Sequence, residues 1–139
     1  MSRILPAAHP LRRRRVDEIN AHYLAHVAIG FPITLEGNAE TLQTAREVDG
    51  INWLTVKGLY EEAVLAGLGD EPGIAFLQTT SNARYYMTPN QALAIIRDLR
   101  AWSIAVWDRW NTLKNAARDP AQTPTAASLE MLNIEQGWP

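Results

Sequence analysis

Two histidines and a carboxylate are spaced so that they could share a metal ion. Glu18, His22 and His26 follow one another at intervals of four residues, and residues four apart lie on one face of a helix. Imidazole nitrogens and a carboxylate oxygen are typical zinc ligands. However, the glutamate that follows the first histidine in helical metalloprotease motifs is replaced by Tyr23. Since histidines on helix surfaces are far commoner than metal ligands, Glu18, His22 and His26 are weak metal candidates, and we expect no metal or cofactor.

A run of arginines, Arg12 to Arg15, is the second feature that could bind a ligand. Guanidinium groups bind phosphates and nucleic-acid backbones. The alternative is a solvated first turn of a helix, although positive charge there opposes the helix dipole. That conflict favours an acidic partner surface. The whole chain carries a formal charge of −2, so no general basic field exists and nucleic-acid binding is not expected.

No arrangement of nucleophile and base stands out. Ser2, Ser81, Ser103 and Ser128 lack the glycine-flanked context that exposes a catalytic serine, and the chain has no cysteine. The glycines at 67 and 69 are not followed by the lysine of a phosphate-binding loop. No apolar run reaches the roughly 18 residues that a membrane-spanning helix needs. We therefore expect neither an enzyme nor a membrane protein.

The elements that would position these residues are three helices and two short hairpins. Apolar periodicity and capping residues predict helices over residues 12–30, 44–67 and 88–117. Short strand-forming runs predict hairpins over 32–43 and 74–87. The predicted fold class is thus α+β and helix-dominated, in the order helix, hairpin, helix, hairpin, long helix. Residues 1–11 would form a loose arm, 12–117 a single domain and 118–139 an extended tail with a short apolar segment.

The second helix carries an ambiguity. Thr44 and Glu47 suggest a capping box at its start. An inner stripe is expected at Val48, Ile51, Thr55, Leu59 and Ala63, with Trp53, Val56 and Tyr60 beside it. Gly50 and Gly58 lie inside the same helix, where each costs roughly 1 kcal/mol relative to alanine. These glycines either permit the close approach of another backbone or mark a break in the helix.

The long helix is the strongest sequence signal. Thr88 and Gln91 form a capping box around Pro89, which suits the first helical position. Apolar residues then recur every 3.5 residues on average, the period of a seam that packs against other helices. The predicted interface residues are Ile96, Leu99, Val106, Trp110 and Leu113 on this seam, with Trp102, Trp107 and Trp138 as further contacts. The seam could equally be covered by the chain's own first two helices.

Several short segments resemble a domain of unknown function found in tail-fibre and tail-associated proteins of tailed bacteriophages. They are an arginine-rich start with Glu-Ile-Asn over residues 15–20, a Gly-Phe step into a hairpin at 30–35, and an aromatic strand at 74–77. A Met-Thr step at 87–88, a Leu-Lys-Asn-Ala close at 113–116 and the ending 132–139 complete the resemblance. The first hairpin lacks the aromatic residue expected after its turn.

The resemblance implies a protein of the virion tail, made in the cytoplasm of the bacterial host, that acts by packing against other tail or fibre proteins. It implies no catalytic residue. An assembly chaperone that is absent from the finished particle is the alternative, and a small metal-dependent enzyme is a third, unlikely reading. A heptad-spaced seam buried between copies would favour a small symmetric homo-oligomer. Because the tail fibres of the resembling proteins are commonly threefold, a trimer is the expected state.

Overall fold

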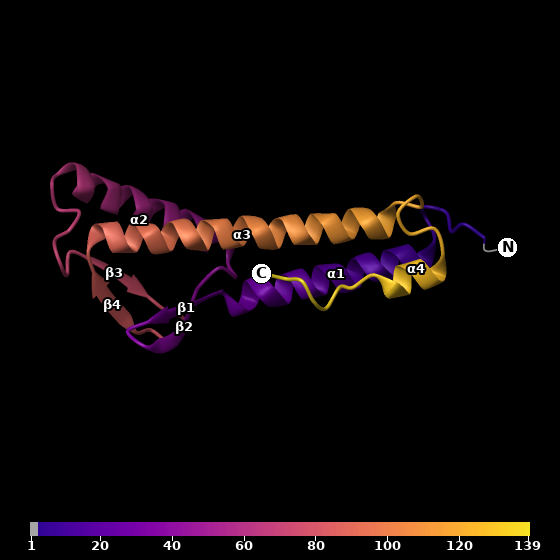
Figure 1. Cartoon of the computed structure of the whole chain (residues 1–139), viewed down its shortest axis with the longest axis horizontal. Helices are drawn as coiled ribbons and strands as arrows, with labels where there is room; N and C mark the ends of the chain where they lie inside the picture. Colours follow the sequence, from indigo (N-terminus) through magenta and orange to yellow (C-terminus); the bar gives the residue numbers. More distant parts are fainter. Residues whose placement is uncertain (1–2) are drawn as a thin grey trace. The chain divides into compact units, whose positions relative to one another are not determined.

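The chain consists mainly of helices, with two small hairpins between them. A computed structural model describes residues 3–139 and is 55% helical and 13% strand, which confirms the helix-dominated α+β class. The elements are α1 (Pro10–Ile29), β1 (Phe31–Leu35), β2 (Asn38–Leu42), α2 (Glu47–Leu65), β3 (Ala75–Gln78), β4 (Arg84–Met87), α3 (Pro89–Arg118) and α4 (Ala126–Met131) (Figure 1). The short helix α4 was not expected from the sequence. Within the described residues no helix is long and apolar enough to cross a membrane.

The described chain forms two compact units where the sequence favoured a single domain over 12–117. One unit joins the segment ending at His26 to Ile104–Pro139, and the other is the continuous segment Val27–Ser103. We call them the terminal unit and the central unit. The long helix α3 contributes its first half to the central unit and its second half to the terminal unit.

The terminal unit has a core to which both ends of the chain contribute. Its buried residues are Val16, Ile19, Leu113, Ala117, Leu129 and Ile134. Residues 118–139, expected as an extended tail, supply two of these and include α4. Leu5, inside the expected loose arm, packs on the same core, and its amide donates to the carbonyl of Pro124 at 2.8 Å. Burial of these apolar side chains holds Leu5 and the segment from residue 126 to 134 in one unit.

The central unit is built on two antiparallel hairpins, β1–β2 and β3–β4. The first turns through Glu36 and Gly37, both with positive φ (50° and 80°), as a two-residue primed turn requires. Gly30, which follows α1, has φ of 96°, and a β-carbon there would lie 2.4 Å from the carbonyl oxygen of Leu42. Only glycine fits where the chain leaves α1 and enters the hairpin. The amide of Thr80 donates to the carbonyl of Thr41 at 2.9 Å and links the hairpins.

Helix α2 is unbroken, but its predicted inner stripe is wrong. Val48, Ile51 and Leu59 are 45%, 62% and 58% exposed, and the buried residues are Asp49 and Tyr60. Tyr60 faces inward because its hydroxyl donates to the carbonyl of Phe76 (2.8 Å) and accepts from that residue's amide (3.0 Å). The polar tip thus satisfies the free edge of β3 while the ring joins the core.

The start of α2 also differs from the expected capping box of Thr44 and Glu47. The amide of Arg46 donates to the Asp49 carboxylate at 2.9 Å, while the Thr44 hydroxyl donates to the carbonyl of Val27 at 2.7 Å. Burial alone would raise the pKa of Asp49, but the hydrogen bonds and the charge of Arg46 outweigh it and lower that pKa. The Thr44 hydroxyl is therefore bonded to a residue distant in sequence and does not cap the helix.

The start of α3 agrees with the sequence. The Gln91 amide donates to the Thr88 hydroxyl at 3.1 Å, and the Thr88 amide donates to the Gln91 side chain at 3.0 Å. The predicted capping box is therefore confirmed, with Pro89 at the first helical position. Both bonds lie within one turn, so they depend on no distant residue.

Candidate protein-docking site

The weak metal candidates have other partners in the structure. The Glu18 carboxylate lies 2.5 Å from Arg15 and 3.8 Å from Arg14. The ring of His26 stacks on Trp138 with centroids 5.0 Å apart, and burial together with the nearby His22 lowers the pKa of His26. Within residues 3–139, no group of three or more His, Asp or Glu side chains is arranged to hold a metal ion.

The arginine run divides into structural and exposed members. Arg12 is 1% exposed and donates only to oxygens of the chain itself. Its acceptors are the carbonyls of Leu5, Pro6, Ala117 and Thr123 and the Thr123 hydroxyl. Arg15 binds the carbonyls of Leu129 (2.9 Å) and Leu132 (2.7 Å) at the end of α4. Two of the four arginines thus hold the terminal unit together, and Arg13 and Arg14 are left at the surface.

Most of the predicted interface seam is covered by the chain itself. Ile96, Leu99, Val106 and Leu113 are 2–6% exposed. Trp110 stacks on Tyr23 with centroids 4.3 Å apart, and its indole N–H donates to Asn20 at 2.8 Å. The seam therefore builds the fold, which is the internal alternative that the sequence left open.

The remaining predicted interface tryptophans differ in their surroundings. Trp102 lies beside Phe31, with ring centroids 5.7 Å apart. Trp138 is half-buried on His26, and its indole N–H donates to the carbonyl of Ile134 at 2.8 Å. Trp107 is 54% exposed, with Ile104 one turn away at 59%. Of the eight predicted residues, Trp107 is the one whose side chain is exposed enough to meet another protein without rearrangement.

A larger apolar surface lies on the outward side of α2, where the sequence placed the core. Val48, Ile51, Leu54, Leu59 and Leu65 are 45–89% exposed. Gly50 and Gly58 are on the same helix, and a β-carbon built on either would meet nothing within 4 Å. No contact inside the chain requires these glycines, although each costs the helix roughly 1 kcal/mol relative to alanine. Large exposed apolar patches mark interaction sites.

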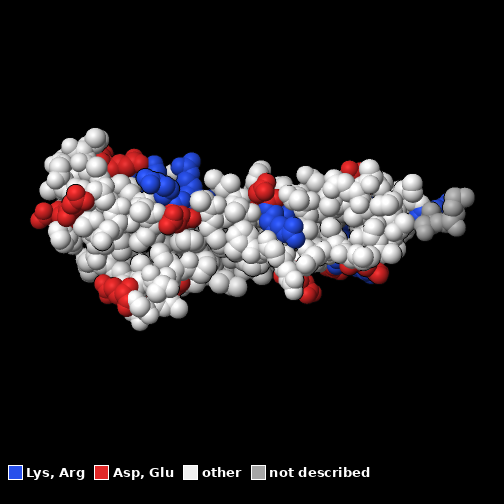
Figure 2. All heavy atoms as spheres, in the orientation of Figure 1, with Lys and Arg blue, Asp and Glu red and all other residues white. Residues whose placement is uncertain are grey.

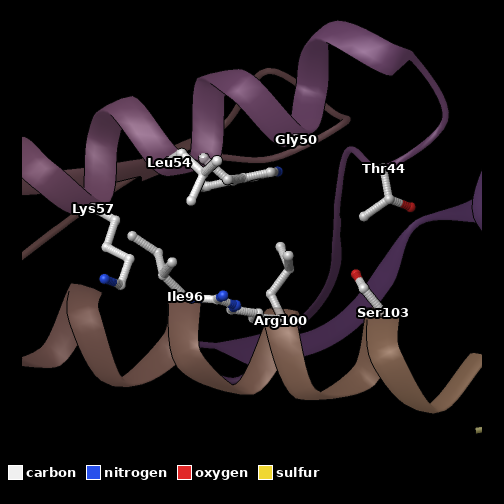
Figure 3. A pocket seen from close by; sticks show the side chains of 9 residues that line it. Thr44, Gly50, Leu54, Lys57, Ile96, Arg100 and Ser103 are labelled. Carbon is white, nitrogen blue, oxygen red and sulfur yellow. The ribbon is translucent and has the colours of Figure 1, made fainter.

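A pocket of about 290 Å³ lies beside this surface, between α2 and the first half of α3 in the central unit (Figure 3). Its floor includes the buried Ile96 and Leu99. Trp53 also lines it. Gly50 and Leu54 lie on the α2 side, opposite Ile96, Arg100 and Ser103 of α3 (Figure 3). We call this hollow the α2–α3 pocket. Its interior is apolar. Because Gly50 has no side chain, nothing at that position obstructs entry to the pocket.

Two cations line the same pocket from facing helices. Lys57 belongs to α2 and Arg100 to α3 (Figure 3). Figure 2 shows basic side chains gathered over the region where α2 and α3 lie together. The Lys57 ammonium is 2.5 Å from the exposed Glu61 carboxylate. Within the part of the chain that the structure describes, Arg100 has no ion pair or side-chain hydrogen bond.

A second hollow of about 340 Å³ lies on the other side of Trp53, toward the β3–β4 hairpin. Its charged groups are already engaged, because Arg46 binds Asp49 at 2.8 Å. The hydroxyl of Tyr60, which also lines it, is bonded to the backbone of Phe76. The α2–α3 pocket is therefore the better candidate for an external ligand.

Sequence reasoning missed this pocket, since it placed the exposed stripe of α2 inside and named neither Leu54, Lys57 nor Arg100. The signal that pointed toward it was the pair of glycines inside a helical pattern, one of whose explanations was close approach of another backbone. Comparison with known proteins adds nothing to the assignment: no protein-family model, curated protein or solved structure matches the chain.

Proposed function

We propose that this chain is a structural component of a bacteriophage tail, associated with a fibre or the baseplate, and that it acts by packing against other tail proteins. The observation that carries the packing role is the exposed apolar side of α2. Val48, Ile51 and Leu54 are large apolar side chains that the fold leaves 45–62% exposed on one helix. Burying them against a partner would release water from apolar surface and stabilise the complex.

The assignment to a phage tail rests on the resemblance of the segments at 15–20, 30–35, 87–88 and 132–139. Three of these segments have definite structural roles in this chain. Arg15 anchors the end of α4, Gly30 makes the close turn into β1, and Thr88 caps α3.

The homo-oligomer, with a trimer favoured, stays a prediction. The seam that suggested it is buried within the chain, so contacts between copies would have to use side chains that the fold leaves exposed. Trp107 and Ile104 on α3 and the outward side of α2 are two such apolar surfaces. Light scattering over a range of protein concentrations would give the state directly.

Mass spectrometry of purified virions tests the proposal. The virions would be prepared from a phage whose gene for this chain is intact. Virions from the same phage with that gene deleted would be the control. A constant copy number per particle supports a structural role. Presence in infected cells but absence from the particle would favour the assembly chaperone instead, because a chaperone holds its client only until assembly is complete.

A further inference from the structure

We propose that the α2–α3 pocket receives a bulky apolar side chain from a neighbouring protein, and that Lys57 and Arg100 bind a carboxylate on the same segment of that neighbour. This deepens the proposed function, on which it rests, by naming the contact and the chemistry of the partner. The occupant to which we commit is an amphipathic segment of another protein with an acidic residue close to its apolar anchor.

The size and lining of the pocket fit a side chain. Its volume of about 290 Å³ is just below the range for small-molecule sites, which is roughly 300–1,000 Å³. Ile96 and Leu99 give it an apolar floor, and Trp53 gives it an aromatic wall. An apolar side chain that binds there would move from water to a preformed apolar surface, which is favourable.

Gly50 leaves the way into the pocket open. Because a β-carbon at this position would meet no atom within 4 Å, the glycine is not there to relieve crowding inside the chain. A longer side chain at the same position would project beside the pocket that Gly50 lines. Glycine allows the close approach of another backbone, as the proposed docking requires.

Charge selects a partner with a carboxylate. Within the described residues, Arg100, which lines the pocket, makes no ion pair, and Lys57, which faces it from α2, is paired with the exposed Glu61 alone. A guanidinium binds a carboxylate with two parallel hydrogen bonds, which adds directional preference to the attraction. An acidic residue on the incoming segment would complete this pair.

The surface next to the pocket can hold a segment longer than one residue. Leu54 lines the pocket and is 60% exposed, and Ile51 on the same helix is 62% exposed. Amphipathic helices bind apolar grooves in this manner, with anchors spaced at three or four residues. The main apolar side chain of the partner segment would enter the pocket, and Ile51 would contact the next turn of that segment.

A displayed library of random peptides, selected on the full-length protein, provides the probe. We expect enrichment of peptides that carry an acidic residue within about one helical turn of bulky apolar residues. Enriched peptides would then be synthesised and titrated against the protein while the fluorescence of Trp53 and the other indoles is followed. Each peptide would also be tested with its acidic residue changed to the amide, which should weaken binding about tenfold.

Two pairs of variants locate the binding. Gly50→Leu places a side chain at the pocket, whereas Gly58→Leu adds the same side chain to the same helix at a position that also has free space but does not line the pocket. Arg100→Gln removes the unpaired cation, and Arg97→Gln removes a cation of α3 outside the pocket. We expect loss of about tenfold or more in affinity for Gly50→Leu and Arg100→Gln and unchanged affinity for both controls. Circular dichroism checks that all four variants fold.

Four results would overturn the proposal. The first is a selection whose peptides lack the acidic and apolar pattern, or which bind Gly50→Leu as tightly as the unchanged protein. The second is specific binding of decanoate, but not of peptides, which would make the site one for free fatty carboxylates. The third is self-association that Gly50→Leu abolishes and Gly58→Leu does not, which would make the occupant a second copy. Normal virions assembled with Gly50→Leu would reject the pocket as the contact while leaving the tail assignment intact.

Discussion

The guanidinium of Arg12 donates to both the hydroxyl and the carbonyl oxygen of Thr123, at 2.9 and 2.6 Å, although the two residues are 111 positions apart in the chain. Arg12 also reaches the carbonyl of Ala117 near the end of α3 at 3.1 Å. A cation there is favourable because the last carbonyls of a helix are unpaired and carry partial negative charge. One side chain thus joins the start of the chain to the end of its longest helix.

Arg12→Met should therefore destabilise the protein strongly. The substitution leaves buried carbonyl oxygens without donors, and unpaired buried groups of this kind cost about 1–3 kcal/mol each. We expect the free energy of unfolding to fall by roughly 3 kcal/mol or more, measured by urea denaturation. Arg13→Met, at an exposed neighbouring arginine, is the control and should change stability by less than about 0.5 kcal/mol. If the two substitutions lowered the free energy of unfolding equally, the buried hydrogen bonds of Arg12 would not be what stabilises the protein.

Trp110→Ala should unfold the terminal unit and not merely separate subunits. The indole stacks on Tyr23 with planes 13° from parallel, donates to Asn20, and lies 3.4 Å below the Lys114 ammonium. Truncation of a packed tryptophan costs roughly 3–5 kcal/mol. Trp107→Ala, at a side chain that is 54% exposed, should cost far less. Light scattering and circular dichroism of both variants would be measured together, and a folded but dissociated Trp110→Ala protein would contradict this expectation.

Gly137→Ala should release the C-terminal segment locally. Gly137 has φ of 82°, and a β-carbon there would lie 3.0 Å from the guanidinium of Arg109, which binds the carbonyls of Asn133 and Gln136. Gly73→Ala is the matched control, since Gly73 has φ of 80° but free space around it. Both substitutions carry the left-handed backbone cost of about 1–2 kcal/mol. Only Gly137→Ala should accelerate amide hydrogen exchange at Gln136. Equal protection of this amide in the two variants would show that Arg109 does not hold the C-terminal segment in place.

Stability should decrease in mildly acidic solution because of His26. Burial, with the charge of His22, lowers the pKa of His26 in the folded protein, so the unfolded chain binds the proton first, at about pH 6.5. The free energy of unfolding therefore falls as the pH drops below that value and continues to fall until the folded pKa is passed.

His26→Phe keeps an aromatic ring for Trp138 but cannot titrate, and it should weaken this part of the pH dependence. Urea denaturation of both proteins at several pH values between about 7 and 5 measures the difference. An NMR titration of the His26 ring provides an independent check. A folded-state pKa at or above the ordinary value would refute the explanation.

Local sequence signals were reliable where the partners were also local. Thr88 and Gln91 were predicted to cap α3 and do so through two hydrogen bonds. Thr44 carries the same kind of signal, yet its hydroxyl is bonded to the carbonyl of Val27, and the Asp49 carboxylate accepts from the amide of Arg46, the residue before α2. A capping motif thus describes what a hydroxyl can do, and the surrounding fold decides which acceptor it meets.

The sequence by itself determined α1, α2, α3, the two hairpins and their order, because these follow from apolar periodicity, turn residues and capping over short distances. Only the tertiary structure decided which side of α2 is buried, since that helix has apolar residues on both sides and Tyr60 is fixed by its bonds to β3. It also decided that Arg12 is an internal clamp, and it placed Lys57 and Arg100 on one pocket. Those outcomes depend on contacts between segments that are distant in the sequence, and the energies of such contacts cannot be deduced from any single segment.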